Sequence, residues 1–311
     1  PAHETDFVDL RDEGSPVDKR RVLLEGDADR RTRLPVDRLC VIPGQPVSYW
    51  LDDQLRRHFD GGRRLGDIAE VPGSQHKTAA NKTYVKKWWE VGSGELHRGP
   101  MALDPADAPE RLAPEAGARW IFYSKGGRFS PWWGNWEHVV DWSEAARTFY
   151  SDNSTSNLLA DEYRFRQGIC YTDFAGRTFN ARWMPPGCLF DMAGPAIFPQ
   201  TDDHPAPRRR LFALLAVLNS SPVRQLLNAL NPSIHYQVTD LRRLPVPAFD
   251  TATEARLAEM ALDMVRAVRQ RDADAEESPV VLSEDVDTWT DDVVERHAAE
   301  IDQLVTNVVY G

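Results

Sequence analysis

The stretch Ser124–Trp142, SKGGRFSPWWGNWEHVVDW, holds the residue types best suited to binding. It places two glycines between Lys125 and Arg128 and adds four tryptophans. Glycine weakens a strand and cations are costly to bury, so this glycine segment is expected to be a loop. A loop that offers flat aromatic faces beside positive charge suits a planar or an anionic partner. The alternative is that the tryptophans form an aromatic corner of the core.

A basic, amide-containing segment precedes this loop. Residues 54–90 carry eight basic and four acidic side chains, a local excess of +4. Carboxamides such as Gln75 and Asn81 can pair with adenine edges, and lysine or arginine can hold phosphates or guanine. For each cation taken singly, a solvated surface charge is the preferred interpretation. Jointly, the cations and amides of the two segments favour a binding face.

No catalytic group is apparent. Asn231-Pro232-Ser233-Ile234 partly matches the Asn/Asp-Pro-Pro-aromatic motif of N6-adenine methyltransferases. In those enzymes the motif holds the flipped base. Serine replaces the second proline, isoleucine cannot stack as a ring does, and a helix precedes the motif, so a helix-ending turn is the preferred interpretation. The histidines lack metal-ligand spacing, and no glycine-rich cofactor turn follows a strand. We therefore expect no catalytic residue and no metal site in this chain.

Composition describes a globular chain of one large or two ordinary domains. Its 311 residues are 41% hydrophobic and 27% charged. No apolar run approaches membrane-spanning length, and no signal peptide is apparent, so no membrane partner is expected. The three cysteines, Cys40, Cys170 and Cys188, are far apart and odd in number, which predicts a cytoplasmic protein without a disulfide framework. The start at Pro1 suggests a piece of a longer protein.

The net charge of −11 is unevenly distributed. Residues 250–311 hold sixteen acidic and five basic side chains, so the rest of the chain balances to zero. An acidic tail on a neutral body with a basic segment is compatible with a phosphate-binding face.

Periodicity and turn residues predict a mixture of helices and short strands. Helices are expected at Asp52–Phe59, Asn153–Arg166, 208–230 with a break at Ser220–Pro222, Glu254–Arg271 and Val293–Val309. Strands are expected within Cys40–Leu51 and at Leu65–Val71, Tyr84–Val91, Arg119–Tyr123, Gly168–Thr172, Thr178–Trp183, Gly187–Met192, Ile234–Val238 and Leu244–Pro247. The acidic stretch Asp272–Asp292 is expected to be a disordered linker.

Six stretches, in this order, resemble one protein family. They are 42–51, 65–91, 120–142, 168–199, 214–247 and 301–311, with IPGQPVSYWL at the start and IDQLVTNVVYG at the end. Together they resemble the C-terminal part of the PglX-type adenine-specific DNA methyltransferases of BREX and phage-growth-limitation systems, which are related to type IIG restriction-modification enzymes. The loop at 73–81 departs from the family's usual sequence.

The resemblance implies an α+β fold with a mixed or antiparallel sheet and a helical C-terminal region. It implies a connector at 1–40, a DNA target-recognition domain at 41–249, and an acidic linker with C-terminal helices at 250–311. Double-stranded DNA would be the partner, and other BREX proteins are further candidate partners. The methyltransferase domain, which would use S-adenosyl-L-methionine, would lie upstream and outside this chain.

The candidate DNA contacts lie on the two polar segments. The lysines within residues 54–90 would hold the DNA backbone. Residues that approach the bases would come from 124–142, which we call the tryptophan loop. The full set is Gln75, Lys77, Thr78, Asn81, Lys82, Lys86, Lys87, Lys125, Arg128, Trp132 and Asn135.

Two other functions stay open on the sequence alone. One is a protein-interaction module that docks other defence proteins or a phage inhibitor through exposed tryptophans and the acidic tail. The other is a carbohydrate-binding module with Trp132, Trp133 and Trp136 as sugar platforms, which fits the ordered resemblance poorly. The salt dependence of affinity distinguishes a protein-interaction module from a DNA-binding domain. Phosphate contacts weaken steeply as the salt concentration rises, whereas apolar docking does not.

Overall fold

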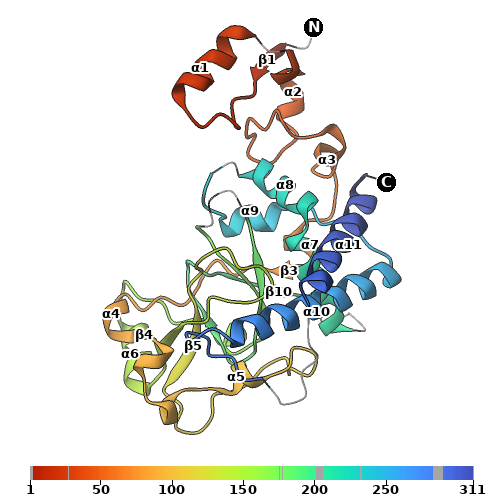
Figure 1. Ribbon diagram of the computed structural model, residues 1–311. Helices are drawn as coiled ribbons and strands as arrows, with labels where there is room; N and C mark the ends of the chain where they lie inside the picture. The colour runs from red at the N-terminus through yellow and green to blue at the C-terminus, as the bar shows by residue number, and fades with distance from the viewer. Residues whose placement is uncertain are drawn as a thin grey trace.

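The computed structural model describes residues 3–26, 28–174, 176, 178–200, 206–231, 233–282 and 290–310. Two four-stranded sheets occupy the middle of the chain, and long helices lie beside them (Figure 1). An N-terminal lobe projects from one end. This mixture confirms the α+β class expected from the sequence, whereas the domain boundaries at 40/41 and 249/250 stay predictions.

The N-terminal lobe is a strand pair with a helix between its strands. Strand β1 (Glu4–Val8) pairs antiparallel with β2 (Arg31–Pro35), and α1 (Pro16–Glu25) connects them. Ser15 caps α1 by accepting the N–H of Asp18 at 3.1 Å. A short helix, α2 (Val36–Leu39), then leads out of the lobe.

The strand expected within Cys40–Leu51 is absent, and a buried arginine explains why. The segment is a series of turns that ends at helix α3 (Asp53–Arg57). The guanidinium of Arg56, which is 4% exposed, donates to the carbonyl oxygens of Arg38, Ser48 and Leu51 at 3.0–3.2 Å. These carbonyls therefore need no neighbouring strand.

The two sheets form the core of the middle region. The first has the order β3 (Ala69–Glu70), β10 (Ala196–Pro199), β7 (Gly168–Tyr171) and β8 (Ala181–Met184), all antiparallel. The second has the order β4 (Val85–Lys87), β6 (His138–Asp141), β5 (Trp120–Ser124) and β9 (Leu189–Phe190), with only β5 and β9 parallel. Every residue of β5, β7, β8 and β10 is buried, so both faces of these strands are covered. The strands expected at Arg119–Tyr123, Gly168–Thr172, Thr178–Trp183 and Gly187–Met192 are thus confirmed, with shifted ends.

The long helices lie against the first sheet and one another. Helix α7 (Pro207–Asn219) ends at Ser220, and α8 (Ser221–Leu230) restarts there, as the proline after the break predicts. Helix α10 (Thr251–Ala273) packs along α7, and α11 (Asp291–Tyr310) packs on α10. The side chain of Asn219 ties α7 to β8 by bonding both the N–H and the carbonyl of Ala181, at 3.0 and 2.9 Å.

The prediction of a helix at Asn153–Arg166 is wrong. The helix in this region is α6 (Glu144–Asp152), which Ser143 caps by accepting the N–H of Ala146 at 3.3 Å. Downstream, Asn157 exchanges backbone hydrogen bonds with Lys77 at 2.8 and 2.9 Å. This bridge holds the segment extended, and only one 3₁₀ turn forms in it.

Four expected strands form only in part or not at all. Leu65–Val71 starts with a 3₁₀ turn before β3, and Tyr84–Val91 contributes only the three residues of β4. Ile234–Val238 and Leu244–Pro247 flank helix α9 (Val238–Arg243) and form no strand of either sheet.

Capping carboxylates account for most of these differences. Asp67, Glu90 and Asp240 each accept a hydrogen bond from the backbone N–H three residues earlier, at 2.8, 2.6 and 3.1 Å. Such a bond starts a helical turn where hydrophobic spacing alone suggests a strand.

Candidate nucleic-acid interface

The tryptophans of 124–142 belong to the core. Trp132, Trp133, Trp136 and Trp142 are 6%, 0%, 2% and 8% exposed. The ring of Trp133 lies 5.8 Å from that of Trp183, and the guanidinium of Arg269 stacks over both. Aromatic rings gain most from burial, so the core-corner alternative describes this structure. Trp132 in particular offers no free ring face to a base. The expectation that Trp132 contacts DNA is therefore wrong for this structure.

The loops at one end of the sheets form a continuous surface. Backbone hydrogen bonds join His76 to Phe190 at 3.1 Å, Asp191 to Ser124 at 2.9 Å, Asp173 to Ala193 at 3.0 Å and Tyr236 to Asp173 at 2.9 Å. These bonds place residues 73–78, 125–130, 172–174, 191–194 and 233–235 beside one another. We call this surface the loop edge.

The loop edge carries apolar side chains that the sequence reasoning missed. Phe129, Phe174, Met192 and Ile234 are 53%, 59%, 55% and 46% exposed. Each lies on a different loop of the edge. A large apolar residue within a polar or glycine-containing turn is the sequence signal that could have found them. Exposed apolar residues grouped on one surface mark a binding face.

The expected cations do not all stay free. Lys125 forms a 2.6 Å ion pair with Asp191, which also accepts the O–H of Tyr123 at 3.0 Å. Burial is the main cause that raises the pKa of Tyr123. Lys77 and Arg128 are exposed on the loop edge, and neither pairs with a carboxylate of the described residues. Lys125 is therefore mainly a structural cation, and Lys77 and Arg128 are available to a ligand.

The other candidate lysines lie on α4 (Asn81–Tyr84) and β4. Lys87 sits opposite His138 in the ladder, so it lies at the same end of the sheet as Ser124. It approaches Glu137 at 3.6 Å, and the ammonium of Lys86 donates to the carbonyl of Lys82 at 3.0 Å.

The polar side chains that were expected to read bases form hydrogen bonds within their own loops. Gln75 donates to the carbonyl of Pro72 at 2.8 Å, and Asn135 donates to that of Arg128 at 3.0 Å. The buried hydroxyl of Thr78 donates to Asn81 at 2.6 Å. These hydrogen bonds position the loops and use part of the hydrogen-bonding capacity of each side chain.

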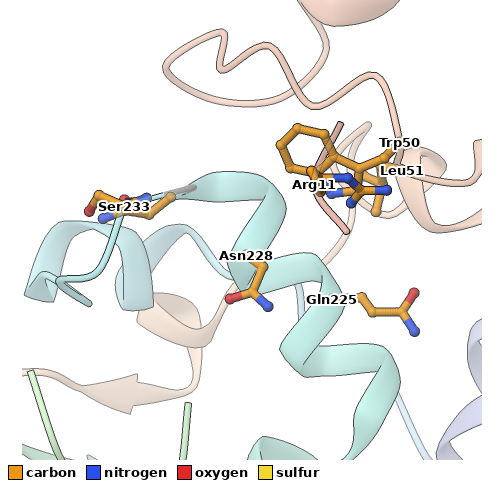
Figure 2. A pocket seen from close by; sticks show the side chains of 7 residues that line it. Arg11, Trp50, Leu51, Gln225, Asn228 and Ser233 are labelled. Carbon is orange, nitrogen blue, oxygen red and sulfur yellow. Dashed lines mark hydrogen bonds between the residues drawn. The ribbon is translucent and has the colours of Figure 1, made fainter. Parts of the chain in front are cut away.

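A pocket of about 490 Å³ lies between the N-terminal lobe and α8. Figure 2 shows Arg11, Trp50 and Leu51 on one side and Gln225 and Asn228 on the other. The guanidinium of Arg11 lies 4.7 Å from the Trp50 ring centre and lowers the pKa of Asp9 to about 2 through its hydrogen bonds.

Asn231 and Ser233, which follow α8, also line this pocket. Asn231 donates to the carbonyl of His235 at 2.7 Å and to Asp240 at 2.5 Å, and it accepts the N–H of Ser233 at 2.9 Å. Its amide is therefore occupied by the turn, in agreement with the structural interpretation of the motif.

The first part of the acidic linker is packed against the tryptophan loop. Asp272 accepts the indole N–H of Trp133 at 3.1 Å, and the carbonyl of Glu277 accepts that of Trp88 at 2.9 Å. We call residues 272–282 the acidic strap. The expectation of disorder is wrong for the strap, and residues 283–289 lie outside the described residues. A cavity of about 540 Å³ between the strap and the loop is lined by Arg128, Asn135 and several carboxylates.

The described part of the chain has few groups suited to a metal or a cofactor. No group of histidine, cysteine, aspartate or glutamate there could hold a metal ion. No described strand leads through a glycine-rich turn into a helix, the arrangement that holds nucleotide-type cofactors. Among the described helices, none is long and apolar enough to cross a membrane.

Comparison with known proteins relates the chain to adenine-specific methyltransferases. It is 27% identical over 232 residues to the adenine-specific methyltransferase PglX of Lacticaseibacillus casei (strain Zhang), covering 72% of this chain and 18% of PglX. It is 25% identical over 205 residues to the adenine-specific methyltransferase BrxX of Escherichia coli O9:H4 (strain HS), covering 66% of this chain and 15% of BrxX. The resemblance to PglX-type methyltransferases is thus confirmed, and the chain spans less than a fifth of these relatives.

No protein-family model matches the chain. Among solved structures, it is similar to the type IIL restriction-modification enzyme MmeI in complex with DNA, with a TM-score of 0.47 and 9% identity. The match covers 79% of this chain and 34% of MmeI.

Proposed function

We propose that this chain is the DNA target-recognition portion of an N6-adenine-specific methyltransferase of BREX-type phage defence. It binds double-stranded DNA and reads a short site, and a domain elsewhere in the protein binds S-adenosyl-L-methionine and methylates the adenine. The observation that carries the proposal is the similarity to two adenine-specific methyltransferases over about 70% of the chain.

The proposed contacts follow from which groups are free. Lys77 and Arg128 on the loop edge would hold phosphates. Lys82, Lys86 and Lys87 on α4 and β4 would add further phosphate contacts, for which Lys86 and Lys87 would exchange their present contacts. The exposed Phe129, Phe174, Met192 and Ile234 would contact bases and sugars. Gln75, Thr78, Asn81, Lys125 and Asn135 would shape the loops, and Trp132 would support them from the core.

Replacing two free cations tests this assignment. We expect Lys77→Ala with Arg128→Ala to weaken binding of the full chain to a fluorescein-labelled duplex by about tenfold at low salt, measured by anisotropy. Arg296→Ala is the matched control, because Arg296 is exposed on α11. Equal affinity of the double variant and the control would contradict the assignment.

A second candidate function has its own observation. The grouped apolar residues of the loop edge suit docking to a protein, such as another defence protein or a phage inhibitor. Binding by apolar docking would change little between low and moderate salt, whereas DNA binding would fall steeply.

A further inference from the structure

A buried arginine without a counter-ion lies beneath the loop edge. Arg182 on β8 is 1% exposed. One terminal nitrogen donates to the hydroxyl of Thr172 at 3.0 Å and to the side-chain carbonyl of Asn180 at 2.7 Å. Its Nε and its other terminal nitrogen have no partner, and no carboxylate of the described residues lies within ion-pair distance. A buried charge in this state is costly unless something compensates it.

The guanidinium is placed under the glycine loop Gly126–Ser130. Asn180, which bonds Arg182, also accepts the backbone N–H of Ser130 at 3.4 Å. Thr172, the other partner, has its methyl carbon 3.1 Å from the position that a Cβ on Gly126 would take. The two groups that hold the guanidinium therefore also contact the loop above it.

The loop itself presents unused donors. Gly126 and Gly127 have φ angles of +70° and +137°, and a side chain on Gly126 would meet the carbonyl oxygen of Ala193 at 2.3 Å. The backbone N–H groups of residues 126–129 make no hydrogen bond to any described residue. Consecutive free N–H groups in such a turn form a concavity that binds anions.

Arg182 and Asn180 leave three side-chain nitrogens without a partner, and the loop adds its free N–H groups. The nearest acids on the loop edge already have partners: Asp191 forms an ion pair with Lys125 at 2.6 Å, and Asp173 is hydrogen-bonded to the ring of His235 at 3.0 Å. A negatively charged group that only accepts hydrogen bonds complements such a set.

We propose that the loop Gly126–Ser130, with Arg182 beneath it, is a binding site for a phosphoryl oxyanion. The loop N–H groups and Arg128 contact the oxyanion, and Arg182 is a positioning residue that supplies the charge below. The oxyanion is either a phosphate of the DNA backbone, in which case the site rests on the proposed function, or a free phosphate ion.

Asn180→Asp gives the sharpest test, because it supplies Arg182 with a carboxylate at an existing hydrogen bond. For the full chain we expect sodium phosphate, against sodium chloride of equal ionic strength, to raise Tm by about 2–4 °C in a saturable way. Asn180→Asp should keep or raise the Tm in chloride and lose the phosphate effect. Arg182→Met should also lose it, and Arg296→Met should keep it. A purely structural Arg182 would leave the phosphate effect intact.

Duplex DNA distinguishes the two sources. If the oxyanion is a DNA phosphate, Asn180→Asp should reduce the slope of log affinity against log salt by about one. A lost phosphate effect with an unchanged slope assigns the site to free phosphate. If phosphate raises the Tm of a chain that binds no DNA, the oxyanion site is supported and the proposed DNA-binding function is rejected. No phosphate effect in the wild type, together with equal salt slopes in wild type and Asn180→Asp, would overturn the proposal.

Discussion

His76 lies in the polar loop of the loop edge, yet its side chain serves the core. Its ring is fully buried among those of Tyr123, Trp142 and Tyr150, with centroids 5.6, 5.5 and 4.6 Å away. Neither ring nitrogen makes a hydrogen bond of normal geometry. Burial lowers the pKa of His76 to about 4, so the imidazole is neutral at pH 7.

This burial predicts a pH dependence of stability. Between pH 6.5 and 4 the unfolded chain binds a proton at His76 and the folded chain does not, so stability falls as the pH is lowered through this range. The loss should approach about 3 kcal/mol by pH 4. His76→Phe keeps a ring without a proton site and should flatten this part of the profile, measured by urea unfolding at several pH values. A profile that keeps the wild-type slope would assign the effect to other groups.

Lys125 and Arg128 should differ in how much each contributes to the stability of the fold. Lys125→Met leaves the half-buried Asp191 without its ion pair and should lower the free energy of unfolding by about 1–3 kcal/mol. Arg128→Met removes an exposed, unpaired cation and should change stability by less than about 0.5 kcal/mol. Urea unfolding checks both, and adding Asp191→Asn to Lys125→Met should recover part of the loss. Equal, small effects of the two substitutions would contradict the structural role of Lys125.

At the scale of elements, the acidic strap packs against one side of the tryptophan loop. Its Glu276 and Glu277 line the same cavity as Arg128, so they oppose an approaching phosphate. We expect Glu276→Gln with Glu277→Gln to strengthen DNA binding about two- to fivefold at low salt, and less at high salt. The exposed pair Asp292→Asn and Glu295→Gln on α11 is the charge-matched control. Equal gains from both pairs would point to net charge rather than to the strap.

Elements with strong local signals could be predicted from the sequence. Helices α7, α10 and α11 repeat apolar residues at helical spacing, and β5 and β7 are short apolar runs. The short strands and the helix α6 could not, because capping groups such as Ser143 and Asp240 outweigh hydrophobic spacing there. The tryptophan loop was open to two interpretations, since a core aromatic and a stacking aromatic have the same sequence.

At the scale of the whole molecule, the loop edge could be anticipated only in part. The sequence indicated two of its segments, 73–78 and 125–130, from their cations, and it indicated the relationship to adenine-specific methyltransferases. It could not show that residues 172–174, 191–194 and 233–235 join them, because hydrogen bonds between distant segments create the surface. The unpaired state of Arg182 is likewise a property of the packed sheets, and no spacing in the chain reveals it.

The most direct test of the central claim is the salt dependence of duplex binding by the full chain. Anisotropy titrations with a labelled duplex between 50 and 300 mM salt should show affinity falling steeply, as expected for about three to five neutralised phosphates. A duplex that contains the recognised site should bind more tightly than a scrambled duplex at every salt concentration. Absence of binding at the lowest salt, or an affinity that does not change with salt, would contradict the claim that this chain recognises DNA.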